Sequence, residues 1–264
     1  MSVLADRRTQ AEEIARSAGG LARDFFRDIG SLDISAKTGA LDLVSNADIA
    51  VEKDIRAKLI EAFPDDGIIG EEHAPVPARS DWTWVIDPID GTANFVVGLP
   101  QWCVILACVQ GDGTRVGVIY DPCADEMFSA AAGYGARLNG EPMRVARASG
   151  LDEGRIGLGM NGRTPAEVTP TLLLAIAEEG GLLFHNASGG LMLAYVAAGR
   201  LIGFAEPHMN AWDCLAGQLI VREAGGRCEP QSAKDMLADG GRVVVATPGI
   251  FDRLQLLADK AYSQ

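Results

Sequence analysis

The chain has 264 residues, of which 48% are hydrophobic and 22% are charged, a composition that predicts a folded globular protein with one large domain or two lobes. Its formal net charge of −13 at pH 7 disfavours nucleic acid as a primary partner, because a phosphate backbone repels an acidic surface. No run of about 18 apolar residues occurs, so the sequence offers no candidate membrane span. Surplus carboxylates can attract divalent cations, although most of them lie on solvated helix faces.

The first 30 residues intersperse charged and apolar positions, and therefore lack the continuous apolar core of a signal peptide. The five cysteines are odd in number and include no CxxC pair, which argues against a disulfide framework and against a zinc site. We therefore expect a cytoplasmic protein in a reducing compartment.

Apolar residues at helical spacing predict a first helix over residues 5–29 and a second from about Asn46 until Pro64 stops it. Ser45 and Asp48 have the spacing of a capping box at the start of the second helix. Short β-rich runs bounded by Gly, Pro or Asp predict strands: WTWVID (82–87), WCVILACV (102–109), RVGVIYD (115–121), EMFSAA (126–131) and RVVVATP (242–248). Further helices are expected over residues 165–180, 188–199, 211–224 and 249–260.

Helices and strands mixed in this way, with a strand-rich middle, predict a layered α/β architecture. The stretch RVARASGLDEGRIG (144–157) suggests a soft boundary near residue 148, between lobes of about residues 1–148 and 149–264. The segment GLGMNG (157–162) matches the GxGxxG pattern of dinucleotide-binding proteins. Because no full apolar strand precedes it and Arg-Thr-Pro follows it, we interpret it as a Gly-rich strand end.

The segment WTWVIDPIDGTANF (82–95) carries two carboxylates three residues apart, Asp87 and Asp90, where a strand is expected to end. Pro88 and Gly91 favour a sharp turn there, into a helix that begins near Thr92. The free amides of such a turn can face an anion while the carboxylates face cations. Taken alone, the pattern is more often a surface turn.

Three further carboxylates occupy the starts of helices or the ends of apolar segments. Glu71 follows the short apolar segment GIIG, Asp213 falls in the first turn of the helix expected over residues 211–224, and Asp48 in the first turn of the second helix. Each has an ordinary interpretation, as a loop acid, a favourable charge at a helix N-terminus or a capping partner. None of them predicts a site by itself.

Taken together, three segments resemble the signature of the inositol monophosphatase family: GEEH (70–73), WVIDPIDGTANF (84–95) and NAWDCLAGQLIVREAGG (210–226). The resemblance covers nearly the whole chain from Lys37 onward. Members of this family are magnesium-dependent and typically lithium-sensitive phosphatases. The resemblance implies the αβαβα sandwich of the inositol monophosphatase and fructose-1,6-bisphosphatase type, and a homodimer.

The resemblance also implies a set of two or three Mg²⁺ ions in each active site. Glu71, Asp87 and the carbonyl of Ile89 would hold the first ion, and Asp87, Asp90 and Asp213 the second, while a third would reach Glu71 through water. Ligands made of oxygen alone suit this hard cation, and no histidine is required.

For the reaction itself, the resemblance implies that the amides of Gly91 and Thr92 bind the phosphate. Thr92, hydrogen-bonded to Asp48, would orient the attacking water and help to deprotonate it for in-line attack, without a covalent phosphoenzyme, and Glu71 belongs to the same catalytic set. Lys37 matches a lysine near the family's metal site, although a lone lysine after a loop is ordinarily solvated.

The substrate end departs from the family's usual pattern. Phe184 and Ile202 stand where members often carry an arginine and an aspartate, which puts the identity of the alcohol in doubt. Glu206 matches a residue that contacts a substrate hydroxyl, and the backbone of Ser188 and Gly189 matches the adjoining segment. The ligands Asp90 and Asp213 complete the expected substrate contacts.

We therefore expect a Mg²⁺-dependent phosphomonoesterase acting on a small polyol phosphate, with inositol 1-phosphate as the leading substrate. The alternatives are histidinol phosphate, a nucleotide 3′-phosphate and fructose 1,6-bisphosphate. A second class stays open, a regulatory binding protein on the same fold, since some bacterial relatives are linked to RNA polymerase or ribosome biogenesis.

Overall fold

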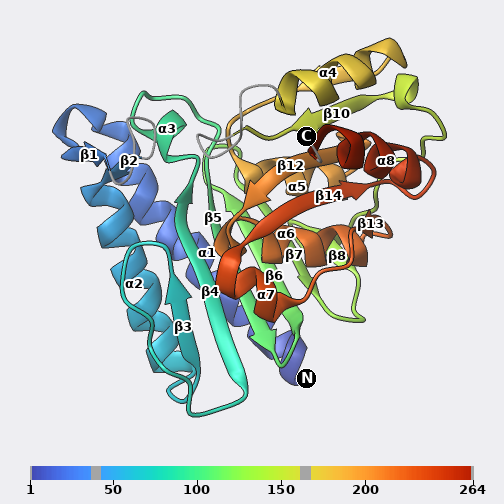
Figure 1. Ribbon diagram of the computed structural model, residues 1–264. Coiled ribbons are helices and arrows are strands. Elements are labelled where there is room, and N and C mark those ends of the chain that lie inside the picture. Colours follow the sequence, from blue (N-terminus) through green and yellow to red (C-terminus); the bar gives the residue numbers. More distant parts are fainter. Residues whose placement is uncertain (1, 37–42, 161–167, 263–264) are drawn as a thin grey trace.

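The computed structural model describes residues 2–36, 43–160 and 168–262, which form alternating layers of helices and sheets (Figure 1). One helical layer covers a seven-stranded sheet, a second lies between this sheet and a five-stranded sheet, and a third covers the outer face of the five-stranded sheet. This order is the αβαβα sandwich that the sequence predicts, and the fold class is confirmed. None of the described helices combines the length and the apolar character that a membrane crossing requires.

The first helical layer consists of α1 (Val3–Arg27) and α2 (Asn46–Ala62). The buried positions of α1 recur at helical spacing and pack on the seven-stranded sheet. The capping box predicted from Ser45 and Asp48 is present at the start of α2, and the helix ends just before Pro64. Both helices are therefore confirmed, and their ends differ from the prediction by about two residues.

The seven-stranded sheet is parallel between its first two strands and antiparallel beyond them. Its third strand, β5, is buried along almost its whole length, because helices cover both faces of the sheet. In spatial order the strands are β3 (Gly67–Gly70), β4 (Trp82–Asp90), β5 (Cys103–Gln110), β6 (Gly113–Asp121), β7 (Glu126–Ala131), β8 (Ala136–Leu138) and β9 (Glu141–Pro142).

The middle layer consists of α5 (Gly189–Ala197) and α6 (Ala211–Glu223). Helix α6 approaches β6 so closely that a Cβ added to Gly117 would lie 2.6 Å from the carbonyl oxygen of Ala216, so only glycine fits there. This close packing brings the first turn of α6 against the first sheet, where β4 ends (Figure 1).

The second sheet and its outer helices complete the layers. Helices α4 (Val168–Glu178) and α8 (Phe251–Tyr262) cover its outer face. In spatial order its strands are β11 (Leu182–Phe184), β10 (Arg155–Leu158), β12 (Gly203–Met209), β14 (Gly241–Ala246) and β13 (Arg227–Cys228). The remaining elements are η1 (Ile29–Ser31), the pair β1 (Ile34–Ala36) and β2 (Leu43–Ser45), α3 (Thr92–Phe95), η2 (Leu151–Glu153) and α7 (Ala233–Asp239).

Some details differ from the prediction. Strand β4 continues to Asp90, so the expected end at Asp87 is wrong. Gly157 and Leu158 end β10, as expected for a Gly-rich strand end, while residues 161 and 162 of GLGMNG and residues 165–167 of the fourth predicted helix lie outside the described residues. The two sheets lie on either side of residue 148, and the division into two lobes there stays a prediction.

Candidate active site

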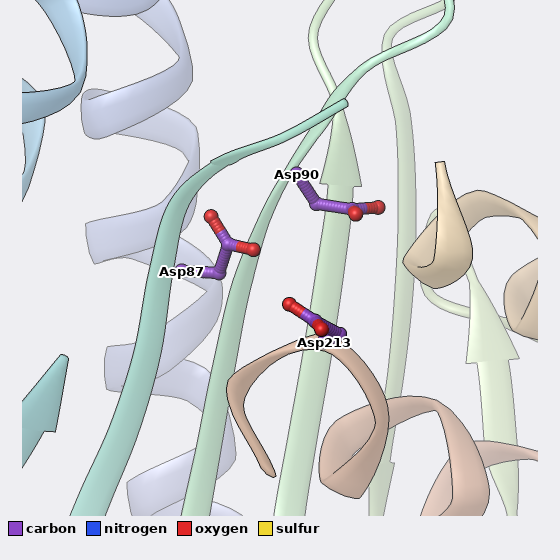
Figure 2. Close-up of side chains that lie close together, drawn as sticks. All are labelled: Asp87, Asp90 and Asp213. Atoms are coloured by element: carbon purple, nitrogen blue, oxygen red, sulfur yellow. The ribbon is translucent and has the colours of Figure 1, made fainter. Parts of the chain in front are cut away.

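Three aspartates form an acidic cluster at the end of β4. One ligand atom from each of Asp87, Asp90 and Asp213 lies within 4.8 Å of those of the other two. Figure 2 shows Asp87 and Asp90 on the same strand and Asp213 on the first turn of α6. Residues 123 or more positions apart in the sequence thus meet because the middle helical layer packs on the first sheet.

A β-bulge explains why Asp87 and Asp90 face the same side. In a regular strand, residues three apart point to opposite faces of the sheet. Here Asp87 pairs with Ile105 and Asp90 pairs with Cys103, so two residues of β4 oppose one residue of β5. The extra residue reverses the alternation, and the bulge accommodates Pro88, which has no amide for the ladder.

Two capping boxes orient two of the predicted site carboxylates. Asp48 and Asp213 are each the third residue of a helix, where one carboxylate oxygen accepts a hydrogen bond from the backbone amide of the N-cap residue. The N···O distances are 2.8 Å from Ser45 to Asp48 Oδ2 and 3.0 Å from Asn210 to Asp213 Oδ2. Among the described residues no donor binds Asp213 Oδ1, so the cap fixes the side chain and leaves this oxygen for the site.

Asp90 connects the first sheet to the middle layer. Its Oδ2 accepts hydrogen bonds from the hydroxyl of Ser188 and from the amide of Gly190, at 2.8 Å for the latter, and the thiol of Cys103 lies 3.4 Å away. Ser188 is also the N-cap of α5, where its Oγ accepts from the amide of Leu191 at 3.3 Å. The buried Ser188 side chain is thus occupied within the protein, and its backbone amide donates to Asn186 Oδ1 at 3.1 Å.

The cluster is electrostatically unfavourable as it stands. Burial raises the pKa of Asp87 well above its usual value, and the neighbouring charge of Glu71 raises it further. The pKa of Asp213 is raised well above the usual value by burial and then by the charge of Asp90, whose own pKa is also raised by burial. Within the described ranges, none of the three aspartates forms an ion pair with Lys, Arg or His. A divalent cation would relieve this repulsion, and the all-oxygen donor set suits Mg²⁺.

Thr92 lies beside the cluster and contacts Asp48, the partner that the family resemblance implies, and also the carbonyl of Ile89. Its Oγ1 is 3.2 Å from Asp48 Oδ1 and 3.0 Å from the carbonyl oxygen of Ile89. Gly91, just before it, has a φ of 95°, a left-handed conformation that favours glycine, and a Cβ there would lie 2.8 Å from the carbonyl oxygen of Gln101. Burial raises the pKa of Asp48, against the hydrogen bonds from Ser45 and Thr92.

Two further predicted residues lie next to the cluster. Glu71 directly follows β3, which pairs in parallel with β4 so that Gly70 is opposite Ile86, and this register brings Glu71 beside Asp87. Glu206 is a buried residue of β12 whose charge contributes to the raised pKa of Asp213. The second sheet therefore adds an acidic group near Asp213.

The positions that depart from the family pattern lie in different surroundings. Phe184 is partly buried against Tyr195, with ring centroids 6.3 Å apart. Ile202 is buried in the core beneath the outer helices. The backbone of Gly189 lies near Glu206, since a Cβ on this glycine would be 3.9 Å from Glu206 Oε2. Lys37 lies outside the described residues.

Sequence reasoning missed two groups that support the site. Ser188 was assigned for its backbone, and only the fold reveals that its hydroxyl binds Asp90. Asn94 is buried and its Nδ2 donates to the carbonyl oxygens of Gln101 and Asn186, at 2.7 and 2.6 Å, which ties together two loops around the cluster. The N-cap spacing before α5 gave a signal for Ser188, whereas no local pattern marks Asn94.

The layered fold and the oxygen-only acidic cluster together are the arrangement expected of the class of metal-dependent phosphatases. Within this class, a profile of the inositol monophosphatase family matches residues 4–260, and the chain belongs to that family. The resemblance that the sequence motifs indicate is therefore confirmed.

Individual relatives carry two different names. An inositol-1-monophosphatase of Mesorhizobium japonicum is 39% identical over 254 residues, which cover 94% of each chain. A protein of Haemophilus influenzae named Nus factor SuhB is 36% identical over 239 residues, or 89% of this chain and 88% of the relative. Among solved structures, the IMPase of Thermotoga maritima is similar with a TM-score of 0.87 and 30% identity, over 98% of both chains.

Proposed function

We propose that this protein is a Mg²⁺-dependent phosphomonoesterase that hydrolyses a small polyol phosphate, with inositol 1-phosphate as the first candidate. The observation that carries the proposal is the cluster of Asp87, Asp90 and Asp213, whose carboxylates lie close together and repel one another, with no cationic partner among the described residues. The similarity to the inositol-1-monophosphatase of Mesorhizobium japonicum supports the choice of substrate.

One group of residues would hold the metal ions. Glu71, Asp87, the carbonyl of Ile89, Asp90 and Asp213 would hold two or three Mg²⁺ ions. When bound, the ions would neutralise the charge of the phosphate and favour ionisation of a water molecule.

The chain would position the reacting groups around these ions. The backbone amides of Gly91 and Thr92 would bind the phosphate oxygens. The hydroxyl of Thr92 would accept a hydrogen bond from the attacking water and would donate its own hydrogen to Asp48. The 3.2 Å distance between Thr92 Oγ1 and Asp48 Oδ1 supports this arrangement. Glu206 and the backbone of Ser188 and Gly189 would bind hydroxyl groups of the alcohol.

The proposal also includes properties that membership of the family does not by itself establish. We propose that the enzyme is a cytoplasmic homodimer inhibited by Li⁺, and the five free thiols support a reducing compartment. Phe184 and Ile202 leave histidinol phosphate, nucleotide 3′-phosphates and fructose 1,6-bisphosphate as alternative substrates. Phosphate release measured across these esters and inositol 1-phosphate tests the choice, and hydrolysis of none of them would contradict the proposed activity.

A second candidate function is a regulatory binding protein in transcription. The observation that favours it is the similarity to proteins named Nus factor SuhB, at 36% identity for the Haemophilus influenzae protein. The two functions predict different results for a variant with Asp87→Asn and Asp213→Asn. This variant should lose phosphate release, whereas it should still capture the transcription machinery in a pull-down if the second function holds.

A further inference from the structure

A buried ion pair on α2 holds the loop that follows β3. Glu52 Oε1 accepts a hydrogen bond from Arg56 Nε at 2.7 Å. Glu52 also accepts two backbone amides of the loop, from Glu72 at 2.7 Å and from His73 at 3.1 Å. Arg56 donates to two backbone carbonyls of the same loop, those of His73 at 3.0 Å and Ala74 at 3.1 Å. We call Glu52 and Arg56 the α2 clamp.

The two side chains of the α2 clamp are buried, although the loop that they hold is not. Glu52 is 0% exposed and Arg56 is 8% exposed, so a substitution of either one would leave a buried charge without its partner. The pair approaches the end of β3 closely, because a Cβ on Gly70 would lie 2.6 Å from Glu52 Cδ and 2.9 Å from Arg56 Nη2. Glycine at position 70 therefore allows the clamp to reach the backbone.

Only one residue lies between the end of β3 and the segment that the clamp holds, and this residue is Glu71. Its backbone is fixed on one side because Gly70 pairs with Ile86 of β4. On the other side it is fixed because Glu72 and His73 are bound to Glu52. The backbone of Glu71 is therefore held from both sides.

We propose that the α2 clamp is a positioning device for Glu71, which holds the backbone on the C-terminal side of this residue so that its carboxylate meets the aspartates of the site when a cation binds. Glu52 and Arg56 themselves contact neither substrate nor cation. The inference rests on the proposed metal dependence, and it assigns to α2 a second contribution to the site in addition to Asp48. Partners that orient a metal ligand typically contribute 10- to 100-fold in metal affinity.

A second buried ion pair at the other end of the same strand provides the matched control. Asp66 directly precedes β3, pairs with Arg7, and accepts hydrogen bonds from Ser80 Oγ at 2.7 Å and from Trp84 Nε1 at 3.0 Å. It is buried like Glu52, but it lies before β3 whereas Glu71 follows it. A merely structural ion pair should therefore behave alike at both places.

The experiment measures the affinity for Mg²⁺ by calorimetric titration without substrate, together with the thermal unfolding midpoint. Glu52→Gln retains the shape of the side chain but replaces an acceptor oxygen by a donor, so it cannot accept all three hydrogen bonds. We expect Glu52→Gln and Asp66→Asn both to lower the midpoint, and only Glu52→Gln to weaken Mg²⁺ binding, by roughly 10- to 100-fold. Equal Mg²⁺ affinity in the two variants would overturn the inference.

A double-mutant cycle tests whether the clamp acts through Glu71. In a Glu71→Gln background, Glu52→Gln should cause little further loss of Mg²⁺ affinity, because the ligand that it positions is already absent. Independent, multiplicative losses would overturn the inference. If Glu52→Gln does not fold, Arg56→Lys serves instead, since lysine keeps the charge but carries all its donors on one nitrogen, whereas Arg56 uses three separate nitrogens for Glu52 and the two carbonyls; it should weaken Mg²⁺ binding, and unchanged affinity would overturn the inference.

The same Mg²⁺ titrations distinguish a failure of the proposed function from a failure of this inference. A wild-type protein that binds no Mg²⁺ would contradict the metal dependence, and the inference with it. A wild-type protein that binds Mg²⁺ as tightly as Glu52→Gln does would contradict the inference alone.

Discussion

Two groups of carboxylates in this protein differ in what faces them. Asp66 and Glu52 each face an arginine and accept further hydrogen bonds from neighbouring donors. Asp87 and Asp213 face other carboxylates, and burial and these charges raise their pKa values. Asp66 and Glu52 thus have their counter-charge within the chain, whereas the three aspartates of the acidic cluster form no ion pair among the described residues, and we propose that a cation binds there.

The largest effect should come from removing that cation. A chelator should abolish phosphate release, and Mg²⁺ should restore it, because the cluster supplies only oxygen ligands and negative charge. The measurement is phosphate release before chelation, after it, and after addition of Mg²⁺ or Zn²⁺. Full activity after exhaustive chelation would show that the acidic cluster does not depend on a cation. An absolute requirement for Zn²⁺ would contradict the choice of metal.

The next largest effect concerns Asp48, a carboxylate that falls between the two groups because it has neutral donors but no arginine. Thr92→Ala and Asp48→Asn should each lower kcat by about 10² to 10⁴ with little change in KM, as for a positioned proton acceptor. The double variant should be little worse than the poorer single variant, because the two residues act as one unit.

The control for this pair is the unfolding midpoint. If Asp48 serves only as a helix cap and Thr92 only as a turn residue, the variants should lose about 1 kcal/mol of stability and keep their turnover. Multiplicative losses of kcat in the double variant would contradict the coupled unit.

A paired substitution tests the comparison directly. Asp213→Asn should lower turnover by roughly 10²- to 10³-fold, as for loss of one preorganised electrostatic group, while the metal-free protein stays folded because asparagine can still accept the N-cap amide. Asp66→Asn should instead destabilise the protein by about 3 to 5 kcal/mol, since it leaves Arg7 buried without its partner, and should retain turnover at low temperature. Kinetics and denaturant unfolding on both variants measure the two effects, and the reverse pattern would show that the division into two groups is wrong.

The smallest effect is a dependence of metal-free stability on pH. The pKa of Asp87 is raised above its usual 3.8, so the folded protein binds this proton more tightly than the unfolded chain does. The resulting stabilisation is fully present below about pH 4 and is lost as the pH rises through the raised folded-state pKa. In the presence of a chelator at pH 8, Asp87→Asn should therefore unfold at a higher temperature than wild type. The difference should be on the order of 2–4 °C for each 1 kcal/mol by which the substitution raises the free energy of unfolding.

This gap should shrink as the pH approaches 4, and saturating Mg²⁺ should reverse it, because only the wild type then gains the bound cation. A wild-type protein that is more stable than Asp87→Asn under chelation at pH 8 would indicate a counter-charge supplied by the protein itself.

The elements that sequence predicted well are those whose signals are local. The helical spacing of apolar residues predicted α1 and α2, and the spacing of Ser45 and Asp48 predicted a capping box that the structure contains. The strands β10 and β12 were harder to predict from the sequence. Helices cover both faces of their sheet, so their residues do not alternate between apolar and polar. As a result, Glu206 could be assigned from the family resemblance but not placed on a strand.

By itself, the sequence determined the family, the layered fold and the identity of the acidic residues, since these follow from motifs and from periodicities within short segments. Only the tertiary structure decided how the residues are held. The bulge that turns Asp87 and Asp90 to one side depends on the register with β5, and the hydroxyl of Ser188 binds Asp90 from 98 positions away. The α2 clamp likewise joins Glu52 to a loop about 20 residues further along the chain. Such contacts form when layers pack, and packing brings together segments whose separation in sequence carries no periodic signal.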